Sequence, residues 1–236
     1  MTTLPWAPRA AKTAERETRS ECERGAAANF DGLARLYRWM EFFTFGPWLE
    51  RCRFAFLDDL AGCRRGVVLG DGDGRFAARL LGTNAKIEID AIDVSREMLR
   101  ALVKRAGPDA ARVRGFCADA RERPPTQAPY DLVATHFFLD CLTDGEVRAL
   151  AERMRGAVSA DGVWVVSEFA IPEGAFGRWM ARPLVRLLYR AFGLLTGLAI
   201  RELPNHGAAL RGAGFTLRRR RAFLRGLLVA ELWRAD

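Results

Sequence analysis

Residues 67–76 read Val67-Val68-Leu69-Gly70-Asp71-Gly72-Asp73-Gly74-Arg75-Phe76. The leading apolar residues predict a buried strand, and the three glycines at every second position predict a tight loop that leads into a helix. Glycine permits sharp turns and lets a ligand approach backbone that a Cβ atom would block. A helix that opens at Gly74 directs unpaired N–H groups toward such a ligand. The stretch therefore indicates a cofactor loop in an α/β domain.

The spacing of the glycines argues against a dinucleotide. The GxGxxG fingerprint requires a glycine five residues after the first one, and Arg75 occupies that position. An NAD-dependent oxidoreductase is therefore the weaker interpretation of this loop. Because glycine-rich turns also occur without any ligand, the neighbouring strand ends have to identify what the loop binds.

Composition narrows the class of protein. The chain has 236 residues, of which 50% are hydrophobic, and a net charge of +8, so it can bury the core of one domain with an appendage. Only Lys12, Lys86 and Lys104 are lysines, and the arginines are spread along the chain. The one dense basic run, Arg218 to Arg221, falls in a predicted strand. We interpret it as a solvated face, and nucleic acid is not an expected partner.

Cysteines and histidines give no metal-binding pattern. The five cysteines lack CxxC spacing and are interpreted as reduced, and His136 and His206 lie far apart in the sequence. We expect no metal. The first 25 residues are polar and charged, and no apolar run reaches the ~20 residues that cross a bilayer. The sequence therefore predicts a cytoplasmic protein, or one attached to a membrane only at its surface.

Strand and helix signals alternate after Gly66. Strands are expected at 66–70, 87–93, 112–118, 130–136 and 162–169. Helices are expected at 74–82, after the cap residue Ser95, and at 144–158, where Thr143 and Glu146 have capping-box spacing. This alternation predicts a parallel, doubly wound sheet. Strands at 214–221 and 227–233 follow one another with no helix between them, so the sheet should end in an antiparallel strand.

Three regions are expected around this sheet. Residues 1–25 are predicted to form a mobile arm, 26–61 a helical cover, and 62–236 the main domain with a helical insert at 171–213. The segment 178–200 of the insert combines an apolar helix face with arginines. Such a face suits peripheral contact with a membrane, a greasy substrate or the protein core equally well.

Acidic residues follow the next two strands. Asp93 ends the second strand, where a carboxylate can accept hydrogen bonds from both hydroxyls of a ribose. Asp119 follows the third strand and is succeeded by the small residue Ala120, so it can receive an exocyclic adenine amine. Each acid has a plainer interpretation, because Asp93 can cap the next helix and Asp119 can stabilise a turn.

With these residues the sequence resembles the class I S-adenosylmethionine-dependent methyltransferases over residues 30 to 234, and is similar to their small-molecule and quinone-biosynthesis subgroup. The resemblance implies a Rossmann-like, mostly parallel seven-stranded sheet of order 3-2-1-4-5-7-6 under an N-terminal helical cover. It also implies a set of residues around S-adenosyl-L-methionine: Gly70, Asp71, Gly72, Asp73 and Gly74 at the methionine part, Asp93 at the ribose, Val94 and Met98 at the adenine face, Asp119 and Ala120 at the adenine edge, His136 in the pocket wall, and Tyr37 in the helices that fold over the cofactor.

One position departs from the family pattern. Many members carry an acidic residue two positions before the first glycine, where this chain has Val68. We expect Asp71 and Asp73 to supply negative charge near the cationic cofactor instead. His136 is the candidate general base, because imidazole titrates near neutral pH, and Asp140 is a candidate to orient it or to bind substrate. A pocket-wall role for His136 and a turn-capping role for Asp140 remain the alternatives.

The sequence thus predicts methyl transfer from S-adenosylmethionine to a small, apolar or aromatic acceptor at oxygen, nitrogen or carbon. Such a displacement depends mainly on alignment and exclusion of water. The alternatives are an NAD-dependent oxidoreductase, a nucleic-acid methyltransferase, and a non-catalytic binding module on the same fold. The oligomeric state is left open.

Overall fold

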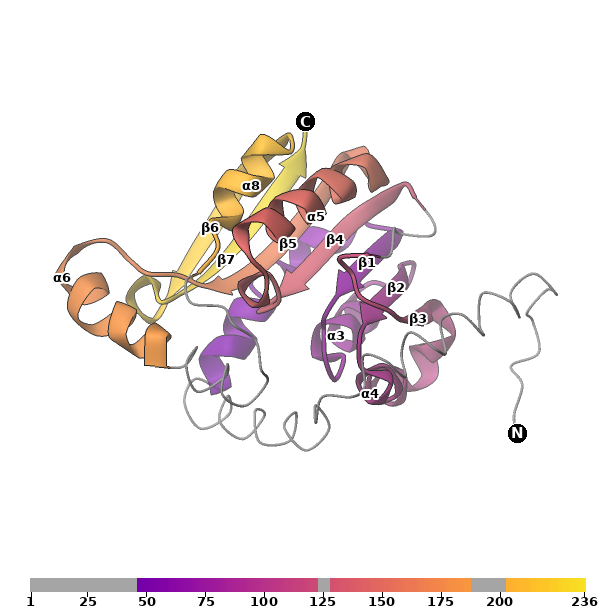
Figure 1. Cartoon of the computed structure of the whole chain (residues 1–236). Coiled ribbons are helices and arrows are strands. Elements are labelled where there is room, and N and C mark those ends of the chain that lie inside the picture. Colours follow the sequence, from indigo (N-terminus) through magenta and orange to yellow (C-terminus); the bar gives the residue numbers. More distant parts are fainter. Residues whose placement is uncertain (1–45, 123–127, 188–202) are drawn as a thin grey trace.

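The computed structural model describes residues 46–122, 128–187 and 203–236. Its centre is a seven-stranded sheet of order β3-β2-β1-β4-β5-β7-β6 (Figure 1). Neighbouring strands from β3 to β5 pair in parallel, whereas β7 pairs antiparallel with both β5 and β6. The doubly wound sheet, its order and its antiparallel end are therefore confirmed.

The elements follow the expected alternation closely. The strands are β1 (Arg65–Leu69), β2 (Glu88–Asp93), β3 (Val113–Cys117), β4 (Tyr130–His136), β5 (Val158–Phe169), β6 (Phe215–Phe223) and β7 (Leu228–Ala235). The longer helices between them are α3 (Arg75–Thr83), α4 (Arg96–Ala106), α5 (Asp144–Ala157) and α8 (His206–Gly212). Thr143 and Glu146 form the predicted capping box at the start of α5, which holds that helix at a defined position behind β4.

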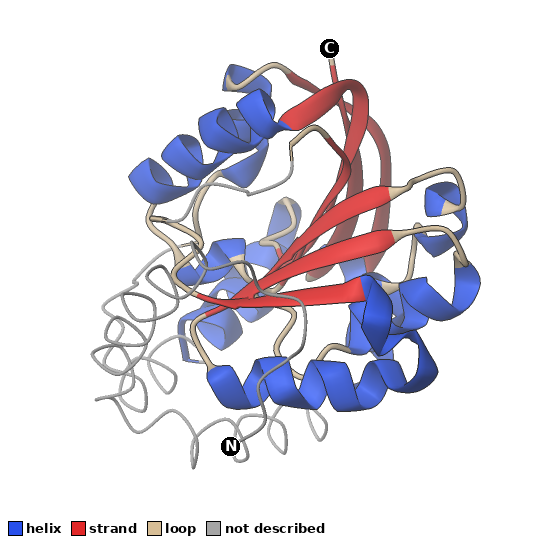
Figure 2. Cartoon of the chain, turned by 90° about the vertical axis from the view of Figure 1, so that its right-hand side faces the viewer, coloured by secondary structure: helices blue, strands red, loops and turns tan. Residues whose placement is uncertain are grey.

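Helices cover both faces of the sheet (Figure 2). On one face, residues 46–53 form a helix whose Leu49 and Cys52 pack in one core cluster with Phe76 of α3 and Leu102 of α4. On the other face, α5 and α8 pack around the buried Trp164 and Trp233 of the central and terminal strands, in clusters that also contain Leu150 and Leu210. Because the strands between β2 and β5 are buried on both sides, they read as nearly continuous apolar runs.

The regions predicted around the sheet are described only in part. The arm at 1–25 and most of the cover at 26–61 lie outside the described residues, and the boundaries of all regions stay predictions. The described part of the cover consists of the 46–53 helix and the short helix Leu57–Leu60. In the described parts of the chain, no helix is both long and apolar enough to span a membrane.

Two further sequence interpretations have definite outcomes. The side chains of the basic run are exposed, as expected for a solvated face, and Arg219 and Arg221 bind Asp59 and the carbonyl of Ala55. The cysteines differ from the expectation. Cys52, Cys63 and Cys141 are free, but Cys117 is disulfide-bonded, so the interpretation of all five as reduced is wrong. Scattered spacing in the sequence could not show that pairing.

Candidate active site

The glycine loop joins β1 to α3 at the carboxyl edge of the sheet. Gly70, Gly72 and Gly74 have φ angles of +65°, +60° and +78°. This left-handed region is open to glycine and costs other L-residues energy because the Cβ atom approaches the following carbonyl oxygen. The alternating glycines therefore give a loop that turns three times within five residues.

The three glycines meet different surroundings. A Cβ atom on Gly70 would lie 2.4 Å from the ring of Phe138, and one on Gly74 would lie 2.6 Å from the Cα atom of Leu102. A Cβ atom on Gly72 would meet no atom of the described residues within 4 Å. Gly70 and Gly74 are thus required by packing inside the protein, whereas Gly72 presents its backbone to open space. Gly72 is the position in the loop where a ligand can approach the chain.

Asp71 completes the N-terminus of α3. Its Oδ2 accepts a hydrogen bond from Ala77 N at 2.9 Å and its Oδ1 accepts one from Phe76 N at 3.3 Å. Burial raises the pKa of Asp71 to about 6, opposed by the charge of Arg53 and by these two bonds. The carboxylate supplies the helix cap that the N-cap residue Gly74 cannot provide. Its position near the methionine part of a cofactor stays a prediction.

Asp73 ties the loop to α4 instead of facing a cationic ligand. Arg105 donates from Nη2 to Oδ2 of Asp73 at 2.7 Å and from Nε to the Asp73 carbonyl at 2.9 Å. Arg75 also lies beside this carboxylate, at 3.3 Å. The carboxylate is buried beside two arginines, and its electrostatic role toward a cofactor stays a prediction.

Asp93 lies where the sequence placed it, at the end of β2 beside the glycine loop. Its Oδ1 accepts from Ser95 N at 2.8 Å, and the backbone N–H of Gly72 also donates to the carboxylate. Burial raises the pKa of Asp93 to about 6, and these two hydrogen bonds oppose the shift. One carboxylate thus fixes the loop at the glycine that is open to ligand. Its contact with a ribose stays a prediction.

The residues after Asp93 offer an apolar surface. Val94 is 53% exposed although it is apolar, and Met98 in the first turn of α4 is half-buried. Ser95 accepts from Met98 N at 3.3 Å and so caps the helix, as the sequence predicts. An exposed valine beside a carboxylate suits one face of a flat ring. The role of both residues at an adenine remains a prediction.

Asp119 has a charged partner that the sequence analysis did not foresee. Arg121 donates to both of its carboxylate oxygens, at distances down to 2.6 Å, and also to Glu146 at 2.6 Å. Burial by itself would raise the pKa of Asp119, but the hydrogen bonds and charge of Arg121 outweigh it and hold the pKa below its usual value. Ala120 is buried. Asp119 therefore remains ionised, and it shares its carboxylate with Arg121.

His136 ends β4 with its ring buried against Phe76, at 4.2 Å between ring centroids. Its Nδ1 lies 2.9 Å from Oγ of Ser167, and that hydroxyl donates to the carbonyl of Cys52. A hydroxyl has one proton, so Ser167 accepts from His136 and Nδ1 carries the imidazole hydrogen. Nε2 then holds a lone pair, and among the described residues it has no partner.

The charge state of His136 follows from its surroundings. Burial, and then the positive charge of Arg53, lower the pKa of His136 well below its ordinary value. The imidazole is therefore neutral at physiological pH. A neutral ring with a fixed tautomer presents a hydrogen-bond acceptor, and it can take up a proton only transiently.

A second polar group lies at the end of β5. Glu168 is 1% exposed, and its Oε1 accepts from the backbone N–H groups of Phe138 at 3.1 Å and Leu139 at 2.8 Å. Its Oε2 is buried without a partner among the described residues. Burial and the neighbouring charge of Asp140 raise its pKa well above the usual range. Phe137 in the same turn has a φ of +54°, a strained conformation of the kind found at functional sites.

Asp140 lies elsewhere than expected. The hydrogen bond that orients His136 comes from Ser167, while Asp140 is buried beside Glu168 and accepts from Sγ of Cys141 at 3.4 Å. Ser167 thus orients the Nδ1 side of His136, and a role of Asp140 toward the ring or toward a substrate stays a prediction. Tyr37 falls in residues 1–45, outside the described residues. Ser167, Glu168 and Arg53 were missed, although two consecutive polar residues at the end of an apolar strand are a signal that the sequence contains.

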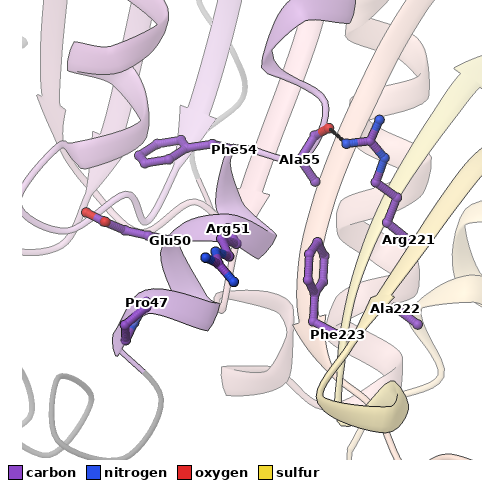
Figure 3. Close-up of a pocket in the computed structure, with 8 residues that line it drawn as sticks. All are labelled: Pro47, Glu50, Arg51, Phe54, Ala55, Arg221, Ala222 and Phe223. Carbon is purple, nitrogen blue, oxygen red and sulfur yellow. Dashed lines mark hydrogen bonds between the residues drawn. The ribbon is translucent and has the colours of Figure 1, made fainter.

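A groove of about 750 Å³ lies beside this region, between the 46–53 helix and β6 (Figure 3). Its lining combines apolar and charged side chains: Pro47, Glu50, Arg51, Phe54, Ala55, Arg221, Ala222 and Phe223. None of the predicted site residues lines it. The 46–53 helix places Cys52 in the core while Arg51 lines the groove, so the groove is separate from the strand-end site.

Comparison with known proteins finds similarity to methyltransferases. Residues 67–164 match the family model of the methyltransferase domain. N-terminal Xaa-Pro-Lys N-methyltransferase 1 of Homo sapiens is 27% identical over 106 residues, which are 44% of this chain and 47% of that protein. The Rattus norvegicus protein of the same name matches equally well. The chain thus spans about half the length of the curated relatives it matches.

Solved structures share the fold. Mitomycin 7-O-methyltransferase MmcR has a TM-score of 0.64 at 18% identity, with 81% of this chain and 55% of that one covered. The N-methyltransferase NodS from Bradyrhizobium japonicum, in complex with S-adenosyl-L-homocysteine, has a TM-score of 0.61 at 16% identity over 93% of this chain and 98% of its own. The chain thus contains a segment that matches a methyltransferase domain, and it shares the fold of these solved methyltransferases.

Proposed function

We propose that the protein transfers a methyl group from S-adenosylmethionine to a small, apolar or aromatic acceptor. One observation carries the proposal: the open backbone of Gly72 is fixed by the carboxylate of Asp93 at the point where β1 and β2 end. A ligand there meets a carboxylate suited to ribose hydroxyls and the exposed side chain of Val94. The residues present therefore fit this cofactor.

Individual roles follow from these positions. Gly72 would approach the methionine part, Asp93 would accept from the ribose hydroxyls, and Val94 with Met98 would contact the adenine face. Asp119 and Ala120 would lie at the adenine edge, where Arg121 restrains the carboxylate. Asp71 and Asp73 would act indirectly, because they hold α3 and α4 against the loop.

The chemistry requires little covalent help from the protein. When bound, S-adenosylmethionine supplies a methyl group on a positively charged sulfur. A nucleophile attacks the methyl carbon, and the sulfur is the leaving group. The protein has to orient the acceptor, exclude water and receive a proton where the acceptor loses one. His136 is our candidate for the last role, because its Nε2 lone pair is oriented by Ser167 and has no partner among the described side chains.

The acceptor atom is not fixed by the similarity to methyltransferases. The similar proteins include an O-methyltransferase and N-methyltransferases. Burial of His136 and Glu168 favours an acceptor whose reacting part is small and largely apolar, because a highly charged group would lose its hydration there. Nucleic acid is a poor fit to such buried groups.

Calorimetry with S-adenosylhomocysteine tests the cofactor assignment. We expect binding by the intact protein and a loss of at least a hundredfold in Asp93→Ala, whereas Asp58→Ala, which changes an exposed carboxylate on another helix, should bind normally. Equal binding by Asp93→Ala would contradict the assignment. Binding of NADH, followed by its fluorescence, would favour the oxidoreductase alternative.

Turnover is tested separately with S-adenosylmethionine labelled with ¹³C in the methyl group. The protein is incubated with an extract of small molecules, and the chemical shift of the labelled methyl in the product distinguishes oxygen, nitrogen and carbon acceptors. Labelled product is the expected result. Cofactor binding with no labelled product in any such extract would favour the binding-module alternative.

A further inference from the structure

The helical residues 174–187 follow β5 and have one face held by the domain. α6 (Gly174–Phe176) continues into a π-helical turn, Gly177–Ala181, and then into helix at 182–187. Gly177, Ala181 and Val185 are buried, and Ala181 and Val185 pack in one apolar cluster with Leu227. A Cβ atom on Gly177 would overlap the carbonyl of Pro172, so the start of the helix is fixed closely against the chain before it.

The remaining surface of this helix carries two kinds of exposed side chain. Arg178, Arg182 and Arg186 recur at every fourth position and are exposed, and none forms an ion pair with a described residue. Trp179, Met180 and Leu187 are 74%, 64% and 65% exposed. Residues 174–187 contain no acidic side chain. We call Arg178, Trp179, Met180, Arg182, Leu184, Arg186 and Leu187 the outward face.

Both properties of the outward face are unusual on a protein surface. Large apolar side chains that are mostly exposed and close together indicate a contact site. Three arginines without a balancing carboxylate indicate an anionic partner. Figure 1 shows the helix at one end of the molecule, away from the sheet edge formed by β3.

The two properties together favour an anionic lipid surface over a second copy of this chain. A symmetric dimer through this helix would bring the three arginines of one copy toward those of the other, and the chain already carries a net charge of +8. A bilayer with anionic headgroups offers negative charge and an apolar layer at adjacent depths. Tryptophan and leucine can enter the headgroup boundary while arginine stems extend toward the phosphates.

We propose that the outward face of residues 174–187 docks the protein on anionic membrane surfaces. The helix lies in the plane of the interface, with Gly177, Ala181 and Val185 still packed on the domain. The contact does not depend on the proposed reaction, so it holds or fails independently of methyl transfer.

Sedimentation with lipid vesicles tests this surface in the full chain. We expect binding to vesicles of phosphatidylcholine with 30% phosphatidylglycerol and little binding to phosphatidylcholine alone. In Arg178→Gln/Arg182→Gln/Arg186→Gln, affinity for the anionic vesicles should fall roughly fivefold per arginine, or about a hundredfold in total. A matched control, Arg79→Gln/Arg100→Gln/Lys104→Gln, removes the same charge from exposed positions on α3 and α4 and should change affinity much less.

The apolar half of the outward face is tested by Trp179→Ser/Leu187→Ser, which should weaken vesicle binding at least tenfold with an unchanged thermal midpoint. Fluorescence gives an independent measurement. The difference between wild-type and Trp179→Phe spectra should move to shorter wavelength when anionic vesicles are added. Equal losses in the arginine variant and its control, or equal binding to both kinds of vesicle, would overturn the proposal. The proposal would also be overturned if the protein bound no vesicles and sedimentation velocity showed a dimer that Trp179→Ser/Leu187→Ser dissociates.

Discussion

The carboxyl ends of β1 and β2 differ from those of β4 and β5 in how their polar groups find partners. At the first pair, Asp93 binds Ser95 two residues away and Asp71 binds the first turn of the next helix. At the second pair, His136 and Ser167 come from different strands, and Glu168 binds backbone about thirty residues earlier. The half proposed to hold the cofactor combines local hydrogen bonds with the longer-range contact of Arg105 with Asp73, whereas the hydrogen bonds named in the half proposed for chemistry are all tertiary.

The two halves also differ in what they leave open. The glycine loop offers an unobstructed backbone at Gly72, while the β4 and β5 ends contain buried acceptor atoms on His136 and Glu168 that have no described partner. Phe138 joins the halves, because its ring fills the space that a side chain on Gly70 would need. A ligand bound at the glycine loop would thus contact a loop that packs, through Phe138, on the ends of β4 and β5.

The largest expected effect separates packing from ligand binding within the loop. Gly74→Ala places a Cβ atom against the backbone of Leu102 and in a left-handed conformation, so we expect the free energy of unfolding to fall by about 3 kcal/mol. Urea denaturation measures the change. If the variant does not accumulate as folded protein, Gly74→Ser in a limited-proteolysis assay should show the same loss.

Gly72→Ala is the matched control for Gly74→Ala. It meets no atom of the described residues within 4 Å, so only the backbone term remains, about 1 kcal/mol. Affinity for S-adenosylhomocysteine should nevertheless fall more than tenfold, because the added methyl group occupies the space proposed for the ligand. If Gly72→Ala destabilised the protein as much as Gly74→Ala, the distinction between the two glycines would be lost.

The next effect concerns the pH dependence of cofactor binding. Burial raises the pKa of Asp93 to about 6, and only the ionised carboxylate accepts from both ribose hydroxyls. Affinity for S-adenosylhomocysteine should therefore fall about tenfold for each pH unit below that pKa. Near pH 6, binding should release protons, which calorimetry in buffers of different ionisation enthalpy detects.

Asp93→Asn is the control for this titration. It should bind weakly and with nearly the same affinity from pH 5 to 7, whereas Asp71→Asn should keep the pH dependence, because Asp71 contacts α3 and not the proposed ligand. A pH dependence that followed Asp71 would assign the titration to the helix cap and weaken the ribose assignment of Asp93.

The contrast between local and tertiary contacts explains which features the sequence could predict. The alternation of strands and helices, the capping box on α5 and the position of Asp93 follow from periodicity and short-range motifs, whereas the strand order was implied by the family resemblance, and all four are confirmed. The partner of Asp73 was not predictable in the same way, whereas Arg121, the partner of Asp119, lies only two residues along the chain and was overlooked. Arg105 lies a full helix away from Asp73, and a chain rich in arginine gives no reason to select it.

Residues at the β4 and β5 ends show the limit more clearly. His136 was located correctly at a strand end, but its orienting partner depends on the register between β4 and β5, which pairs His136 with Ser167. Glu168 follows in an apolar strand and was missed, because strand patterns indicate burial and not which buried acid keeps an unpaired oxygen. Tertiary contacts decide whether a buried acid keeps an unpaired oxygen.

A smaller effect tests the tautomer of His136. Ser167→Ala removes the acceptor of the Nδ1 hydrogen, so the free energy of unfolding should fall by about 1–2 kcal/mol, and the ring should lose its single tautomer. The chain has two histidines, so ¹⁵N spectra of histidine-labelled protein resolve each ring. Ser167→Thr should restore the wild-type spectrum. Unchanged ¹⁵N shifts in Ser167→Ala would show that another group orients the imidazole.

The smallest expected effect is at Glu168. Burial raises its pKa well above the usual value, so the protonated form is favoured in the folded protein, and Glu168→Gln, which imitates that form, should change the free energy of unfolding at low pH by less than about 1 kcal/mol. A raised folded-state pKa means that the folded protein binds the proton more tightly than the unfolded chain. Wild-type stability should thus decline as pH rises above the unfolded pKa, while Glu168→Gln lacks this decline. Urea denaturation at pH 5 and pH 8 measures the difference, and a glutamine variant that lost stability relative to wild type at the higher pH would show that Glu168 is ionised in the folded protein.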